Sequence, residues 1–401
     1  MADIQQAYNY KTTLATLNNV SLVALIASFQ LHYKLFFNIS LICFGVSFLA
    51  EYIYVRGWRD WHWRRVDTWF VSLLMLWLIF PLSLPLTGYG PEFKHEMEKS
   101  LSFLLIGTIG LMHSPHKAPI RVAAWTFIAT AVVINIIILI LTDWHAVVSD
   151  QRHLMAIEVT RATYFGAHMR FNLCQNMALL SAAYIMYKAP HRKERIAAAV
   201  AAPFILLMTF TSQGRIGIIT AIILTAGLII VSLRGRARLL GTLAAAIALA
   251  AGFFFMQGMQ SMQQYDKMSG ELLKTEPRFM IWKSATSVIA QHPLGLGVDK
   301  GMETLHENNS QYPALRDNEL YNTHAHNLWL QYTLYFGVLG FLLISAVMFL
   351  LPFVVDKDKL VLISFTLLPF VLEGAVEVFG SGLPQMLFLI PMWVIVESKT
   401  S

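Results

Sequence analysis

The chain has 401 residues, of which 56% are hydrophobic and only 13% are charged, and its mean hydropathy is +0.55. Because soluble domains carry about 25% charged residues, this composition excludes an ordinary soluble enzyme. Apolar runs of roughly 18 or more residues, the length that crosses ~30 Å of hydrocarbon, recur along the whole sequence. We therefore expect an all-α, polytopic membrane protein.

The formal net charge of +6 fits membrane topology better than nucleic-acid binding, because basic residues gather in cytoplasmic loops. The two cysteines, Cys43 and Cys174, both lie in apolar segments. We therefore expect neither a disulfide framework nor a cysteine metal site. Residues 1–11 are polar, and the first apolar run follows without a small-residue cleavage site, so we expect no cleavable signal segment.

About twelve membrane spans are predicted. Their centres lie near residues 22, 45, 77, 106, 132, 180, 203, 224, 248, 338, 367 and 390. Lysine and arginine cluster in every second connection, at residues 56–65, 117–121, 188–195, 234–238 and 357–359. Since cytoplasmic loops carry the excess of these residues, we expect these connections in the cytoplasm, and an even number of spans then places both termini there.

The other connections would face the outer side, and two of them are long, at residues 143–171 and 257–325. Long ordered loops in compact proteins are usually functional. We therefore divide the chain into transmembrane residues 1–256, an outer loop subdomain of one or two helices at 257–325, and transmembrane residues 326–401.

Three arginines, Arg161, Arg170 and Arg215, break this charge pattern because they lie in or beside outer connections. Arg215 follows Gly214 in a very short turn, where an unpaired arginine at the membrane edge costs several kcal/mol. A snorkelling or ion-paired arginine is one interpretation. The other is that the guanidinium groups bind a polyanion, because their planar fork meets phosphate oxygens bidentately.

Three further residues extend this hypothesis. Asn172 and Asn176, one helical turn apart after Arg170, could line a polar cavity, or Asn172 could cap the helix. Arg278 starts an amphipathic stretch of the large outer loop, where a solvated position on the helix surface is the alternative to a role in binding.

A histidine pair, His324 and His326, lies where the large outer loop re-enters the membrane, followed by Asn327. In a helix the two side chains would point about 200° apart, so a shared metal would need an extended segment and a third ligand. We therefore expect no zinc site. A general base and an interfacial histidine are the two interpretations of this pair.

Few carboxylates are candidates for a functional role. Glu373 and Glu377 are one turn apart on the eleventh predicted span, so we expect them to share a face of it, and a carboxylate inside a span suggests function. The first outer loop, near residues 32–34, has no carboxylate, which argues against glycosyltransferases that place an acid or metal ligand there.

Four motifs and the turn before Arg215 resemble, in order and spacing, the domain shared by O-antigen ligases and O-antigen polymerases. The motifs are Arg278-x-x-x-Trp282-x-x-Ala285, Pro293-Leu-Gly295-Leu-Gly297, His326-Asn327-Leu-Trp-Leu-Gln331 and Phe336-Gly337-Val-Leu-Gly340. The Pro293–Gly297 turn either offers backbone N–H groups to a ligand or is a plain structural turn.

The resemblance implies a GT-C-like glycosyltransferase of the bacterial inner membrane that acts at the periplasmic face. Its donor would be a glycan on undecaprenyl diphosphate and its acceptor a sugar hydroxyl of lipid A–core, with inversion at the anomeric carbon and without metal or another cofactor. Membrane lipids, and no nucleic acid, would be its other partners.

The resemblance also suggests roles for residues. His326 and Arg215 would be catalytic, and the diphosphate would be bound by Arg161, Arg170, Arg215 and Arg278. Further candidates are His324, Asn327, Asn172 and Glu373.

Alternatives remain within and outside this family. An O-antigen polymerase or a protein O-oligosaccharyltransferase would share the motifs. We favour a ligase because the chain is compact, its longest outer loop precedes His326, and no extra domain follows. A transporter of lipid-linked sugar would also need many spans and a cationic cavity, but not a long outer loop that ends in a histidine.

Overall fold

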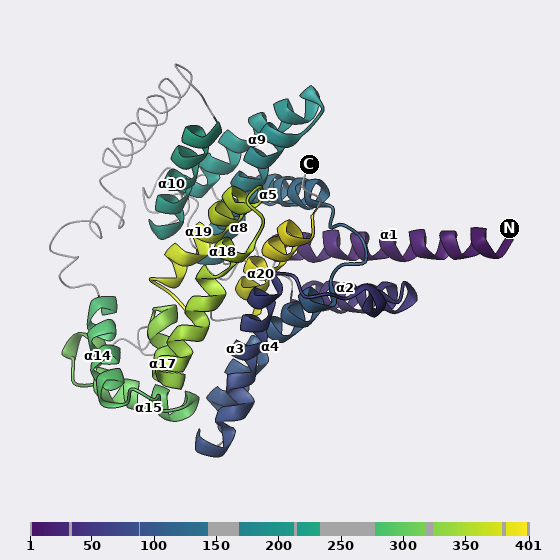
Figure 1. The fold of residues 1–401 in the computed structure, drawn as a ribbon. Coiled ribbons are helices and arrows are strands. Elements are labelled where there is room, and N and C mark those ends of the chain that lie inside the picture. The colour runs from purple at the N-terminus through teal and green to yellow at the C-terminus, as the bar shows by residue number, and fades with distance from the viewer. Residues whose placement is uncertain are drawn as a thin grey trace. The chain divides into compact units, whose positions relative to one another are not determined.

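The computed structural model describes residues 2–31, 34–87, 89–142, 168–211, 215–232, 277–316, 324–378 and 382–398, and its regular elements there are all helices (Figure 1). The chain divides into two compact units. The first comprises residues 1–18, 45–118 and 275–401, and the second comprises residues 19–44 and 119–274. Helices α1 (Ala2–Leu31) and α2 (Lys34–Tyr54) contribute to both units.

The first unit contains most of the described helices. In chain order they are η1 (Gly57–Asp60), α3 (Asp67–Thr87), α4 (Pro91–Met112), α14 (Pro277–Gln291), α15 (Val298–Asn309), α16 (Pro313–Arg316), α17 (Leu328–Phe349), α18 (Leu351–Val354), α19 (Leu360–Gly374) and α20 (Gly382–Glu397). Helices α14 and α15 match the one or two helices predicted in the outer loop, and α16 adds a single turn. Helix α3 packs on α4 and α17, and α14 packs on α15 and α17.

The second unit is a bundle of α5 (Ile120–Leu141), α8 (His168–Lys188), α9 (Arg192–Thr211) and α10 (Arg215–Ser232). Helix α8 lies at its centre and contacts the other three. Its core includes Ile134 and Ile138 of α5, Phe171 of α8 and Met208 of α9. These apolar contacts hold α8, which carries several buried amides, between its neighbours.

The protein is a multi-pass membrane protein. Five helices among the described residues are long and apolar enough to cross a bilayer, at Thr12–Leu31, Lys34–Tyr54, Asp67–Pro85, Ile120–Leu141 and Leu328–Phe349. Shorter apolar helices occur at Ile216–Ile229, Leu360–Gly374 and Pro384–Glu397. The predicted span centres fall in helices throughout the described residues. The predicted span near residue 248 lies outside them.

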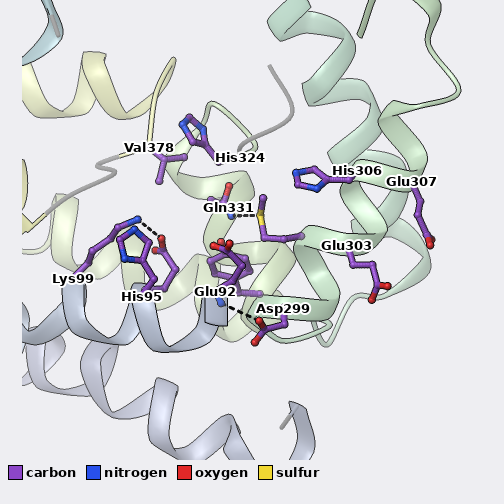
Figure 2. Close-up of a pocket in the computed structure, with 13 residues that line it drawn as sticks. Glu92, His95, Lys99, Asp299, Glu303, His306, Glu307, His324, Gln331 and Val378 are labelled. Atoms are coloured by element: carbon purple, nitrogen blue, oxygen red, sulfur yellow. Dashed lines mark hydrogen bonds and ion pairs between the residues drawn. The ribbon is translucent and has the colours of Figure 1, made fainter. Parts of the chain in front are cut away.

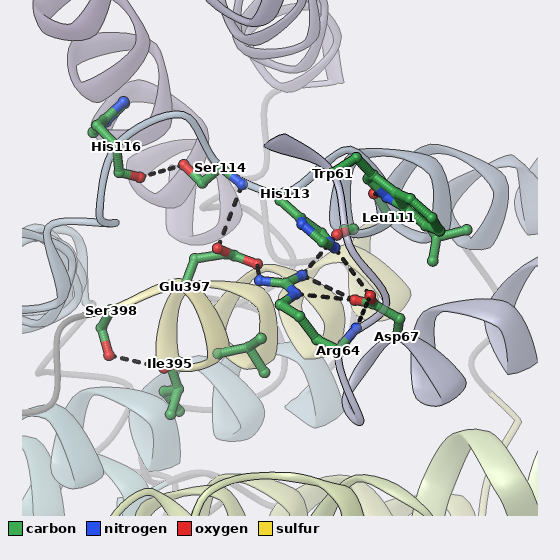
Figure 3. A network of polar contacts seen from close by, with 12 residues as sticks. Trp61, Arg64, Asp67, Leu111, His113, Ser114, His116, Ile395, Glu397 and Ser398 are labelled. Carbon is green, nitrogen blue, oxygen red and sulfur yellow. Dashed lines mark hydrogen bonds and ion pairs between the residues drawn. The ribbon is translucent and has the colours of Figure 1, made fainter. Parts of the chain in front are cut away.

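A buried polar network joins three of the predicted cytoplasmic segments in the first unit (Figure 3). Arg64 pairs with Asp67 at 3.0 Å and, through Nη1, with Glu397 at 2.8 Å. His113 Nε2 lies 3.0 Å from the Asp67 carboxylate, and the Ser114 N–H donates to Glu397 at 3.4 Å. These contacts link the start of α3 and the last turn of α20 to the connection after α4.

An equivalent contact occurs in the second unit. Arg121, at the start of α5, pairs with Glu194 in the first turn of α9, and Trp125 also donates to this carboxylate. Two connections that were predicted to share the cytoplasmic side therefore lie together.

Helix α17 is interrupted at Gly337, where φ is +61°. The Pro293–Gly297 turn fills the break, and a Cβ at Gly337 would collide with the carbonyl oxygen of Pro293. Three backbone hydrogen bonds join the two segments: Leu296 N–H to Leu334, Gly297 N–H to Tyr335, and Val338 N–H to Pro293. The turn is thus structural, and its amides at Leu296 and Gly297 are used within the protein.

Candidate functional site

The motif on α14 holds the loop that carries the histidines. Pro277 occupies the first helical turn, where its missing N–H costs nothing, and Arg278 follows it, as predicted for the start of this helix. One turn later, the indole N–H of Trp282 donates to the carbonyl oxygen of His326 at 3.0 Å. Trp282 therefore fixes the backbone of His326 from a neighbouring helix.

His326 itself has φ of +46°, a left-handed conformation that is uncommon for residues other than glycine. Its neighbour Ala325 is fully buried and donates its N–H to the side chain of Gln331 at 2.6 Å. Strained backbone that the surroundings hold in place is typical of functional sites. His326 is also buried, so its ring is held in one position.

Asn327 caps α17. Its side-chain oxygen accepts the N–H of Leu330 at 3.0 Å, and its Nδ2–H donates to the carbonyl oxygen of Ala375 at 2.8 Å. One asparagine thus ends the histidine loop, starts α17 and ties both to the segment that follows α19. The predicted candidate Asn327 is therefore a positioning residue in this structure.

The loop brings both histidines to one carboxylate. Glu377 lies 3.2 Å from His326 Nδ1 and 3.3 Å from His324 Nε2. The two rings are 4.1 Å apart, and the N–H of His326 donates to His324 Nδ1 at 3.2 Å. Arg278 Nη2 lies 3.6 Å from the same carboxylate. One carboxylate therefore joins three residues that the sequence motifs singled out.

This geometry corrects one expectation. His324 and His326 precede α17 and are not helical, so they do not point in opposite directions. One ligand atom from each histidine and one from Glu377 lie within 4.8 Å of one another. The segment is bent rather than helical, and Glu377 offers the third ligand, so the residues present could hold a shared metal.

The charges in this cluster depend on its burial. Burial chiefly lowers the pKa of His324, to about 4, and neighbouring His326 lowers it further, while Glu377 opposes the shift. Burial would raise the pKa of Glu377, but the hydrogen bond from His326 and the charges of both histidines bring it below its usual value. Glu377 is therefore an anion beside a neutral His324 at neutral pH.

The two glutamates of the eleventh predicted span occupy different settings. Glu373 is buried in the last turn of α19. Glu377 lies beyond the end of this helix at Gly374, so the expectation that both share one face of a span is wrong. Glu377, not Glu373, reaches the histidines, because the chain leaves the helix between them.

A cavity of about 780 Å³ opens beside His324 (Figure 2). It is lined by the first turns of α4, by one side of α15, and by Gln331 and Tyr335 of α17. Pockets of about 300–1,000 Å³ are typical for small ligands. The histidine loop therefore has a ligand-sized cavity on one side.

The histidine cluster and the buried polar network of Figure 3 lie at different ends of α17. Trp69, at the start of α3, donates to the carbonyl oxygen of Val347 near the end of α17, whereas His326 precedes its first turn. Helix α17 has 22 residues, and at 1.5 Å per residue a helix of that length spans ~33 Å, interrupted here at Gly337. The histidine cluster and the predicted cytoplasmic connections are therefore at opposite ends of this helix.

The second unit carries the other predicted diphosphate-binding arginines that the structure describes, Arg170 and Arg215. Arg170 is half-buried in the first turn of α8. Two residues on, Asn172 is buried within that helix, so the capping alternative for Asn172 is wrong. A Cβ at Gly217 of α10 would collide with Asn172, and the Asn176 amide donates to Gly217 at 3.1 Å.

The close approach at Gly217 relates two predicted phosphate ligands. Arg215 begins α10, two residues before Gly217, and Arg170 lies two residues before Asn172. Both arginines are therefore at the same end of the α8–α10 pair. The third, Arg161, lies outside the described residues.

Comparison with known proteins gives a family. Residues 197–345 match the family model described as O-antigen ligase, and this segment includes Arg215, Arg278, His324 and His326 but not Glu377. No curated protein matches the chain. Residues 197–345 are therefore similar to the O-antigen ligase domain, and this similarity supports a glycosyltransferase-like membrane enzyme of the ligase or polymerase type.

Proposed function

We propose that the protein is an O-antigen ligase of the bacterial inner membrane. It transfers a glycan from undecaprenyl diphosphate to a sugar hydroxyl of lipid A–core, with inversion, at the periplasmic face, and both termini are cytoplasmic. The observation that supports this most is the hydrogen-bonded pair of His326 and Glu377, held at the opposite end of α17 from the basic connections.

His326 is the general base of this proposal. With Nδ1–H donating to Glu377 at 3.2 Å, the ring presents the lone pair of Nε2 as the proton acceptor. The acceptor oxygen forms a bond to the anomeric carbon as the bond from that carbon to the diphosphate oxygen breaks. The hydroxyl proton moves to Nε2, and Glu377 stabilises the imidazolium that forms, as a carboxylate does behind a catalytic histidine.

The leaving diphosphate gains negative charge in this step, which fixed cations stabilise. We assign that role to Arg215, Arg161, Arg170 and Arg278. Arg278 also lies 3.6 Å from Glu377, beside the proposed base.

We propose that the transfer needs no metal. His324, His326 and Glu377 satisfy one another through hydrogen bonds, and Arg278 already supplies a cation next to their carboxylate. A divalent ion there would be repelled by the guanidinium. Because the three side chains could nevertheless hold a cation, metal removal belongs in the test.

The test is a transfer assay with purified protein, an undecaprenyl-diphosphate-linked glycan and lipid A–core, without ATP and in excess EDTA. We expect glycan covalently attached to lipid A–core. Longer glycans still on the undecaprenyl carrier would indicate a polymerase, and no covalent product would favour a transporter. Activity that EDTA abolishes and magnesium, manganese or zinc restores would overturn metal independence.

A further inference from the structure

The cavity beside His324 carries an unusual charge. Five carboxylates line it, against the single lysine Lys99 and three histidines, one of which is His324. The carboxylates are Glu92 and Glu96 on α4 and Asp299, Glu303 and Glu307 on α15. The cavity wall is therefore strongly anionic, in contrast to the arginines proposed to bind the diphosphate.

Two of these carboxylates have structural roles. Glu96 forms an ion pair with Lys99 at 2.6 Å, so the charges of these two residues offset each other. Asp299 accepts the backbone N–H groups of Glu92 at 3.1 Å and Phe93 at 3.3 Å, and so caps α4. These contacts explain why α4 and α15 lie together, but they do not account for the other acids.

Glu92, Glu303 and Glu307 remain. Glu303 and Glu307 are four residues apart on α15, so they share a face, and like charges at this spacing destabilise a helix. Both are exposed to the cavity, and across the described ranges no basic side chain pairs with either of them. Their spacing therefore favours a ligand that donates hydrogen bonds to the cavity.

We propose that this cavity binds the acceptor saccharide and selects acceptors whose docked sugars carry hydroxyl or ammonium groups and no phosphate. The proposal rests on the proposed function, since it assigns the acceptor to the cavity that His324 lines. Carboxylates accept hydrogen bonds from sugar hydroxyls and attract ammonium groups, but they repel a phosphate dianion.

The cavity also separates the two substrates by charge. The diphosphate of the donor is anionic and is assigned to arginines, so an anionic wall keeps it from occupying the acceptor position. His324 stays neutral at the boundary, because burial lowers its pKa to about 4. Its neighbour His326 would then face an acceptor hydroxyl. The transfer requires that this hydroxyl lose its proton.

The experiment compares two lipid A–core acceptors that differ only in a phosphate monoester on the terminal sugar, away from the attacked hydroxyl. For the unchanged protein we expect the acceptor KM to be roughly tenfold higher with the phosphate. In the double variant Glu303→Gln, Glu307→Gln this difference should shrink several-fold, and the change should fall in KM rather than kcat. High salt should shrink it in the unchanged protein as well.

Glu98→Gln is the matched control, because Glu98 lies on α4 outside the cavity and pairs with Lys94. It should leave the ratio of the two KM values unchanged. Equal KM values for both acceptors, or a ratio that the double variant does not alter, would overturn the proposal. Binding of each acceptor without donor gives the same comparison, so absence of transfer counts against the proposed function while the cavity is still tested.

Discussion

At the scale of single residues, the proposed chemistry depends most on His326. A general base typically contributes about 10²–10⁴-fold to a rate, so His326→Ala should lower single-turnover transfer by that order. Donor binding should survive, because the diphosphate is assigned to arginines. Single-turnover transfer and donor binding, measured separately, check this.

The control for this variant is His292→Ala, an exposed histidine at the end of α14. It should retain normal turnover. Full turnover of His326→Ala, or loss of its donor binding, would show that His326 is not the base, and Glu373 or substrate-assisted displacement would become the better hypothesis.

Arg215 tests the diphosphate assignment. In Arg215→Lys the positive charge remains, but the planar fork that binds two phosphate oxygens is lost. We expect donor binding and transfer to fall in Arg215→Lys, and Arg192→Lys, at the exposed start of α9, to behave like the unchanged protein. If Arg215→Lys is fully active, the hypothesis of a bidentate contact is wrong, and simple electrostatic attraction explains the role of Arg215.

His324 predicts a pH dependence of stability. Its pKa is 6.5 in an unstructured chain and about 4 in the folded protein, because burial penalises the charged ring. Between these values the unfolded chain binds more protons, so the contribution of His324 to stability is complete above pH 6.5 and declines as the pH falls towards 4. The Tm in detergent should therefore fall less steeply over this range in His324→Gln, and parallel curves would contradict the assignment.

Much of this site could be predicted from the sequence, and one part could not. Arg278, His324, His326 and Asn327 stand in motifs, so their types and spacing identify them. The contact between the histidines and Glu377 could not be predicted. The contact requires that the loop before α17 is not helical and that α19 ends at Gly374. Helical spacing alone gives the wrong directions for the histidines and for Glu377.

At the scale of elements, the break in α17 predicts a local effect on stability. Alanine at Gly337 would have to adopt φ of +61° and would collide with the Pro293 carbonyl oxygen. We expect Gly337→Ala to lower the free energy of unfolding by roughly 2–4 kcal/mol, measured by denaturant or thermal unfolding in detergent.

Gly45→Ala on α2 provides the comparison, because a Cβ there meets no atom within 4 Å. This variant should be neutral or slightly more stable, since alanine favours a helix. Equal stability of the two variants would mean that the turn at residues 293–297 does not fill the break. Sequence periodicity predicted α17 as one continuous span and could not reveal this break, which depends on a turn about 40 residues earlier.

At the scale of the whole molecule, hydropathy and charge predicted the helices well because both act over long segments. Among the described helices near the predicted span centres, five long and three shorter ones follow from apolar length alone. Their grouping into two units does not, since it depends on which side chains pair, such as Arg64 with Glu397 over 333 positions in sequence. Such contacts leave no periodic pattern.

The last prediction concerns the membrane topology. The connections predicted to be cytoplasmic lie together within each unit, through Arg64 and Glu397 in one and Arg121 and Glu194 in the other. The site of His326 is at the far end of α17, so it and α15 should face the periplasm. In intact cells, a membrane-impermeant thiol reagent should label a cysteine at Glu307 and not one at Lys193, both exposed positions.

The background for this labelling comes from two native cysteines, of which Cys43 is exposed and Cys174 is buried. A parent with Cys43→Ala therefore removes the accessible thiol, and permeabilised cells should expose Lys193→Cys and show that it can react. Labelling of Lys193→Cys but not of Glu307→Cys in intact cells would reverse the topology. His326 would then face the cytoplasm, away from any periplasmic acceptor, and the ligase assignment would fail with it.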